Sequence, residues 1–201
     1  VRSDDPAAAA AKSDDPAAEE VKDTETYDAA GRGTLIHRVY ELIDFKRIDS
    51  AEDMKKEIER VLTLDCFSED DRAGFYERND IELMIRFADT ELFGRMKEAD
   101  RRGKLYKEAE FTMGVPSKEL GIGQEGSGTV IIQGIIDGYF IDEDGKAVIM
   151  DYKSDKTANK LTLIKRYKPQ LELYAKALTG IRGLKVKEKI IYSLVAGEVK
   201  L

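Results

Sequence analysis

Residues 130–153 read VIIQGIIDGYFIDEDGKAVIMDYK, and this stretch decides the fold. Its first half is rich in β-branched and aromatic side chains, which favours a strand over residues 130–141. The acidic segment 142–145 ends in Asp144-Gly145, a pair typical of tight turns, and a second apolar run begins at Ala147. The stretch therefore predicts a β-hairpin.

The predicted hairpin brings two carboxylates and a lysine together. With the turn centred near Asp144, Asp137 and Asp151 become cross-strand neighbours to within about one residue, with Cβ atoms roughly 5 Å apart. Because side chains alternate along a strand, Lys153 shares the face of Asp151, and Tyr152 points the other way. A divalent cation would neutralise the two acids and leave Lys153 free to contact a phosphate or a metal-bound water.

Solvated turn residues are the alternative explanation of acids that bracket a hairpin. The apolar context favours the metal site, because Asp137 follows Ile135-Ile136 and Asp151 follows Val148-Ile149-Met150. Both acids thus end runs that look like core strands, and charges placed there need partners.

Charge is distributed unevenly along the 201 residues, whose formal net charge is −7. Residues 1–30 carry a net charge of −6 and repeat Ser-Asp-Asp-Pro-Ala-Ala, which predicts an acidic flexible linker. One globular domain is then expected over residues 31–201. Residues 151–201 carry a net charge of +7. That basic end suits a polyanionic substrate, although a solvated lysine-rich face is the commoner explanation of such a run.

Composition argues against several classes of protein. No apolar run approaches about 18 residues and no signal peptide is visible, so a cytoplasmic protein is expected. Cys66 is the single cysteine, which excludes a disulfide within the chain, and its apolar neighbours predict that it is buried. The glycine-rich segment 121–128 lacks the Gly-Lys-Ser/Thr ending of a P-loop, so ATP is not expected there. A first residue Val1 suggests a piece of a longer protein.

Helices are expected before the hairpin. Apolar residues at helical spacing predict a helix over residues 34–45, and cap residues predict further helices that begin at Ser50, Ser68 and Asp80. The apolar pattern restarts at Thr90. A strand over residues 105–113 follows.

After the hairpin, Lys168-Pro169 is predicted to open a helix, because proline is tolerated in a first turn. Gly180 and Gly183 would end this helix, and residues 187–195 would form a last strand. The fold class is therefore α+β (α/β), with N-terminal helices followed by a β-β-β-α-β arrangement.

Four short motifs occur in a fixed order. They are Gly33-Thr34-Leu35-Ile36-His37, Gly134-Ile135-Ile136-Asp137, Asp151-Tyr152-Lys153 and Gln170-Leu171-Glu172-Leu173-Tyr174. In order and spacing they resemble the motifs of the RecB-like branch of the PD-(D/E)xK nucleases. The likeness covers roughly residues 31–201 and is strongest to the C-terminal nuclease domains of AddA subunits of bacterial ATP-dependent helicase-nucleases (AddAB), especially over residues 166–170. Iron-sulfur relatives use four cysteines, which this chain lacks.

The resemblance implies a restriction-endonuclease-like core and a metal-dependent deoxyribonuclease. Such an exonuclease would hydrolyse unwound single-stranded DNA with Mg2+ or Mn2+, in double-strand break processing and recombinational repair. His37, Asp137, Asp151 and the backbone carbonyl of Tyr152 would hold the metal. Lys153 would orient the attacking water and stabilise negative charge on the phosphate.

The resemblance also implies supporting roles for three further residues. Gln170 and Tyr174 would position Lys153 or the scissile phosphate, with a polar rim on a core helix as the alternative. Glu108 is a weaker candidate that would support the metal indirectly, and the sequence does not separate it from Glu110 on the same strand face.

The implied partners are DNA, helicase domains of the same polypeptide and an AddB-like partner protein, with no membrane. Two other functions remain open. One is a catalytically silent nuclease fold that binds DNA or braces a helicase, against which the complete motif set argues. The other is a metal-binding domain whose basic end docks an acidic protein.

Overall fold

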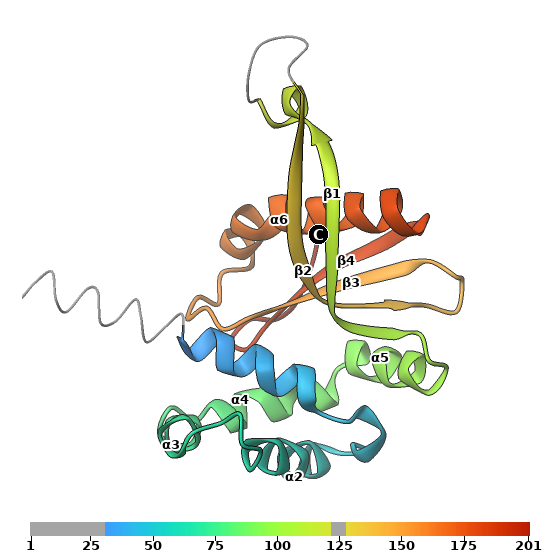
Figure 1. The fold of residues 1–201 in the computed structure, drawn as a ribbon. Helices are drawn as coiled ribbons and strands as arrows, with labels where there is room; N and C mark the ends of the chain where they lie inside the picture. Colours follow the sequence, from blue (N-terminus) through green and yellow to red (C-terminus); the bar gives the residue numbers. More distant parts are fainter. Residues whose placement is uncertain (1–30, 122–127) are drawn as a thin grey trace, which may run out of the picture.

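The computed structural model describes residues 31–121 and 128–201. The predicted linker and most of the glycine-rich segment 121–128 lie outside these ranges. The described residues form one five-stranded sheet with helices on both faces, as Figure 1 shows. This is the α+β architecture that the sequence predicts.

A layer of short helices covers one face of the sheet. It consists of a helix over residues 31–42, η1 (Phe45–Arg47), α2 (Ala51–Leu62), α3 (Glu69–Glu77), α4 (Asp80–Ile85), η2 (Arg86–Asp89) and α5 (Glu91–Arg101). The predicted caps Ser50 and Ser68 are confirmed, because each side chain accepts a hydrogen bond from the backbone N–H three residues later. Thr90 caps α5 in the same way.

Two predictions about these helices are wrong. The first helix ends at residue 42 rather than 45, because the side chain of Asp44 caps the separate η1 turn. Asp80 is not an N-cap. Asn79 takes that position with a left-handed φ of 58°, and the Asp80 carboxylate is buried against Arg32.

The strands are β1 (Leu105–Pro116), β2 (Thr129–Ile141), β3 (Ala147–Lys153), β4 (Val186–Ser193) and β5 (Gly197–Lys200), with η3 (Ser117–Leu120) after β1. They pair in chain order, and β3 and β4 are parallel while the other pairs are antiparallel. The predicted hairpin is β2–β3. The sequence prediction lacked β5, whose four residues are too few to show a pattern and of which only Val199 is buried.

The other face of the sheet is covered by α6 (Lys160–Arg182). The prediction that this helix opens at Lys168-Pro169 is wrong, because Asn159 caps it and Leu163, fully buried, anchors its first turns. Pro169 lies inside the helix. Gly183, with φ of 66°, ends the helix as predicted, whereas Gly180, which was also predicted to end it, lies inside the helix. Across the described ranges, no helix combines the length and the apolar character needed to cross a lipid bilayer.

The sheet separates two hydrophobic cores, and β3 contributes to both because its successive side chains point to opposite faces of the sheet. Val148 and Met150 face the core under the short helices, and Ile149 faces the core under α6. The predicted burial of Cys66 is wrong. Its side chain is exposed, because the turn after α2 directs Phe67 inward instead.

Candidate metal centre and active site

Asp137 marks the point where β2 separates from β3. The ladder between these strands ends at the pair 138–150, and the next two residues are Asp137 and Asp151, which confirms the predicted register. The Asp137 carboxylate accepts the backbone N–H of Tyr152, with 2.9 Å between N and Oδ2. Beyond this point β1 and β2 continue as a two-stranded ribbon that projects from the sheet (Figure 1).

Glu108 on β1 is opposite Asp137, and the β1–β2 ladder is interrupted between them. Residues 107 and 138 pair on one side, and residues 109 and 136 pair on the other. Glu108 has φ of 47°, in the left-handed region that costs a residue with a side chain roughly 1–2 kcal/mol. Backbone strain of this kind concentrates at functional sites.

The interruption shifts the alternation of side chains by one residue on both strands. Residues 106 and 109 would face opposite sides of a regular strand, yet Tyr106 and Ala109 both pack against the core under α6. Ile136 and Tyr139 do the same on β2. Glu108 and Asp137 therefore depart from the regular alternation of side chains at the place where β2 separates from β3.

His37 reaches this place from the helix over residues 31–42. Its Nδ1 lies 3.3 Å from Oδ2 of Asp137, and its Nε2 donates to the carbonyl of Tyr152 at 2.9 Å. Burial lowers the pKa of His37, but the hydrogen bond and charge of Asp137 outweigh it and leave the pKa raised. The Tyr152 carbonyl, predicted as a metal ligand, is thus a hydrogen-bond acceptor for His37 here.

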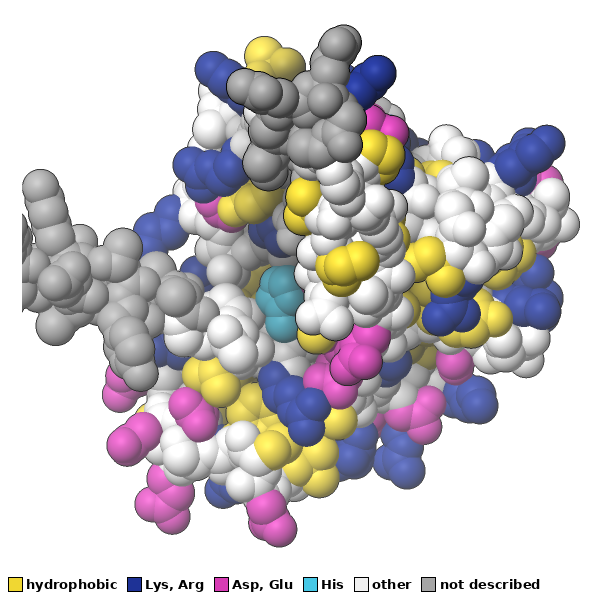
Figure 2. All heavy atoms as spheres, turned by 45° about the horizontal axis from the view of Figure 1, so that its top comes forward, with side chains coloured by type: hydrophobic (Ala, Val, Ile, Leu, Met, Phe, Trp, Pro, Cys, Tyr) yellow, Lys and Arg dark blue, Asp and Glu magenta, His cyan; other side chains and the backbone are white. Residues whose placement is uncertain are grey.

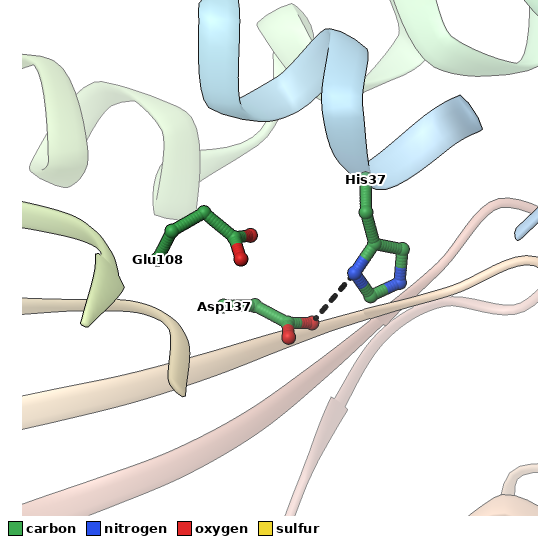
Figure 3. Close-up of side chains that lie close together, drawn as sticks. All are labelled: His37, Glu108 and Asp137. Atoms are coloured by element: carbon green, nitrogen blue, oxygen red, sulfur yellow. Dashed lines mark ion pairs between the residues drawn. The ribbon is translucent and has the colours of Figure 1, made fainter. Parts of the chain in front are cut away.

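Figure 3 shows that His37, Glu108 and Asp137 point toward one another from three different elements. One ligand atom from each lies within 4.8 Å of the others. Nitrogen and carboxylate oxygens at this separation fit a divalent cation, whose ligand distances are about 2.0–2.6 Å. Burial and the charge of Asp137 raise the pKa of Glu108. A bound cation would relieve the repulsion between these two carboxylates. Glu110, by contrast, is exposed and outside this group.

Asp151 is fully buried and does not belong to that group of three. Its Oδ2 lies 2.6 Å from Nζ of Lys153. Apart from this ion pair, neither carboxylate oxygen has a hydrogen-bond partner among the described residues. Burial and the charge of Asp137 raise the pKa of Asp151 to about 6, against the opposing charge of Lys153. An unsatisfied, buried carboxylate of this kind also fits a site for a cation.

Gln170 and Tyr174 contact each other on α6. Nε2 of Gln170 donates to the Tyr174 hydroxyl at 2.7 Å, and Tyr174 is buried. Burial and the charges of Asp151 and Asp137 raise the pKa of the Tyr174 hydroxyl, which therefore stays a neutral donor near the acids. The structure thus brings this pair to the same region as the two aspartates.

Arg32 is a residue of the site that the sequence did not reveal. Its guanidinium binds the buried carboxylate of Asp80, and its Nη1 donates to the Ser154 carbonyl at 2.9 Å. A Cβ on Gly33 would lie 3.3 Å from Oγ of Ser154, so the helix approaches this loop closely. Together these contacts hold the helix that carries His37 against the end of β3.

The surface around the centre is open and partly basic. Figure 2 shows the single histidine of the chain in a hollow beside the β1–β2 ribbon. The loop after β3 and the first half of α6 carry the exposed cations Lys156, Lys160, Lys165, Arg166 and Lys168. Exposed cations next to a metal centre suit an extended polyanion.

The sequence matches the family described as "PD-(D/E)XK nuclease superfamily" over residues 9–199. Among curated proteins it is similar to the A-subunit of the "ATP-dependent helicase/nuclease" of Lachnoclostridium phytofermentans, with 29% identity over 89% of this chain and 15% of that protein. The protein of the same name in Alkaliphilus oremlandii is 31% identical over 83% of this chain and 14% of its own length.

The chain thus spans about one seventh of the curated relatives that it matches. A solved structure titled "Crystal structure of SSO0001" aligns with 61% of this chain and 56% of its own chain, at 20% identity and a TM-score of 0.34. That likeness is too distant to inform the site.

Proposed function

We propose, for a chain that belongs to the PD-(D/E)XK nuclease superfamily, that it hydrolyses DNA phosphodiesters with a bound divalent cation, Mg2+ or Mn2+. The observation that carries the proposal is the cluster of His37, Glu108 and Asp137 beside the ion pair of the buried Asp151 with Lys153. Hard oxygen ligands, one imidazole and one ammonium are the groups that metal-assisted phosphodiester hydrolysis needs.

Each residue has a defined role in this proposal. Asp137, Glu108 and His37 would hold the cation, and Asp151 would join them by turning one unsatisfied oxygen toward it. The cation, when bound, would polarise a phosphate oxygen and lower the pKa of an attacking water. Lys153 would orient that water and stabilise charge on the phosphate, and its side chain is only 12% exposed. Tyr174 would donate a hydrogen bond to the phosphate.

The proposed substrate is single-stranded DNA. The hollow beside the β1–β2 ribbon is open, and the exposed lysines of α6 can neutralise a backbone without reading its bases. Since the relatives carry the name of a helicase/nuclease, we place this domain downstream of helicase domains in one polypeptide. There it would cut strands unwound during double-strand break repair, together with an AddB-like partner protein.

The test is cleavage of a labelled single-stranded oligonucleotide in Mg2+ by residues 1–201. We expect metal-dependent cutting by the native chain, loss of cutting in Lys153→Ala, and unchanged cutting in Lys56→Ala, which removes an exposed lysine of α2. Lys153→Ala should still bind Mn2+ in a calorimetric titration, because an ammonium is not a metal ligand. Mn2+ binding without any cutting by the native chain would favour the catalytically silent alternative.

A further inference from the structure

The ammonium of Lys153 has a second neighbour besides Asp151. Its Nζ lies 4.7 Å from the centre of the Tyr167 ring, over the ring face. An ammonium at this distance is attracted by the negative face of an aromatic ring, and more strongly when water is largely excluded. Lys153 is therefore held between a carboxylate on its own strand and an aromatic face from α6.

Tyr167 is itself fixed in place. Its hydroxyl donates to Oδ2 of Asp155 at 2.6 Å, and Arg166 pairs with the other oxygen of that carboxylate. Asp155 lies two residues after Lys153, in the short loop between β3 and α6. The ring is thus tied to the same segment of chain that carries the lysine, so the three side chains form a closed arrangement.

We infer that Tyr167, anchored by Asp155, is a positioning residue that holds the Lys153 ammonium for catalysis. This inference rests on the proposed function, in which Lys153 is the catalytic cation. A lysine side chain has four rotatable carbon–carbon bonds in its stem and loses considerable rotamer freedom when it is ordered. The ring covers one side of the ammonium and Asp151 takes another, and together they restrict where the ammonium can lie.

A kinetic test separates the contribution of the Tyr167 ring face to kcat from that of its hydroxyl. Tyr167→Leu removes the face, and we expect kcat to fall about tenfold while KM and Mn2+ affinity stay near native values. Tyr167→Phe keeps the face and should recover most of this loss. Asp155→Asn should fold like the native chain and lower kcat a few-fold, since it weakens only the anchor. If Tyr167→Leu raised KM and left kcat unchanged, the ring would be a DNA contact and the inference would be wrong.

A second readout does not depend on nuclease activity. In a chain with 13C-labelled lysine, the Cε–Hε signal of Lys153, assigned through Lys153→Ala, should be shifted upfield by the Tyr167 ring. The shift should persist in Tyr167→Phe and disappear in Tyr167→Leu. A signal unaffected by Tyr167→Leu would overturn the inference even if the native chain cleaves DNA. A shift that behaves as expected in an inactive chain would instead count against the proposed function alone.

Discussion

Asp80, at the start of α4, and Asp151, near the end of β3, are both fully buried, yet their surroundings differ. The Asp80 carboxylate accepts hydrogen bonds from Arg32 at 2.6 and 2.9 Å and from Arg78 at 3.2 Å. The Asp151 carboxylate has one ion pair with Lys153 and is otherwise without a hydrogen-bond partner among the described residues.

This difference indicates that the charge of Asp80 is structural and that the charge of Asp151 is available to bind a ligand. A buried carboxylate with guanidinium partners on several sides is balanced inside the protein. A buried carboxylate with unsatisfied oxygens is unfavourable until something binds to them, and the raised pKa of Asp151 expresses that cost. Asp80 should therefore matter for stability, and Asp151 for chemistry.

The largest expected effect is on cleavage. Asp151→Ala should lower the rate on single-stranded DNA on the order of 10³-fold or more, because it removes a hard oxygen ligand and the partner of Lys153. Asp70→Ala, on the exposed first turn of α3, is the matched control and should cut normally. Single-turnover cleavage at saturating Mg2+ measures both. If Asp151→Ala still cleaved at a tenth of the native rate, the loss would be too small for the removal of a metal ligand, and Asp151 would not be one.

The next effect concerns Asp80. Asp80→Asn should lower the free energy of unfolding by about 3 kcal/mol, because Arg32 would lose the charge that balances its partly buried guanidinium. Urea unfolding measures this. Metal binding per folded molecule should stay near native. A variant as stable as the native chain would show that the pair of Asp80 and Arg32 is not structural.

Replacing Asp151 should have the opposite effect to replacing Asp80, and should raise the free energy of unfolding of the metal-free protein. Its pKa of about 6 lies above the usual 3.8, so its contribution to stability is fully present below about pH 3.8 and is lost as the pH rises through about 6. Asp151→Asn should therefore be more stable than the native chain at pH 8, by roughly 2–3 kcal/mol. The gap should close as the pH falls toward 4. A gap that is constant with pH would point to a packing change instead of the lost charge.

The smallest effect concerns the strained residue. Glu108→Gly should leave stability unchanged or raise it by about 1 kcal/mol, because glycine adopts the φ of 47° without strain. The same variant should weaken Mn2+ binding about tenfold. Glu110→Ala, two residues along the strand, should bind Mn2+ like the native chain. Equal losses in the two variants would mean that general negative charge, and not a ligand, attracts the metal.

The sequence predicted the hairpin and its register because the cause is local. Asp144-Gly145 sets the turn, and the turn sets which residue faces Asp137. Cap residues such as Ser68 were equally readable, since their partner is three residues away. The early start of α6 was missed because Pro169 suggested a helix opening, whereas the burial of Leu163 outweighs the missing hydrogen bond.

The rest of the site depends on contacts between distant residues. Arg32 meets Asp80 across 48 positions, and no pattern in either segment indicates the pairing. Glu108 could not be separated from Glu110, because a regular strand places both on one face and only the left-handed backbone at Glu108 breaks that symmetry. The position of Tyr167 over Lys153 requires the turns of α6 that the sequence prediction lacked.

Urea unfolding of the native chain and of Asp151→Asn at pH 8, each with and without Mn2+, tests the central claim most directly. Without metal, Asp151→Asn should be the more stable of the two. With Mn2+ at about 100 times its dissociation constant, the native chain should gain about 2.7 kcal/mol and Asp151→Asn much less, so that the advantage of Asp151→Asn over the native chain largely disappears. If the two proteins gained equally from Mn2+, or if Asp151→Asn were the less stable one without metal, the buried charge of Asp151 would not be kept for a cation.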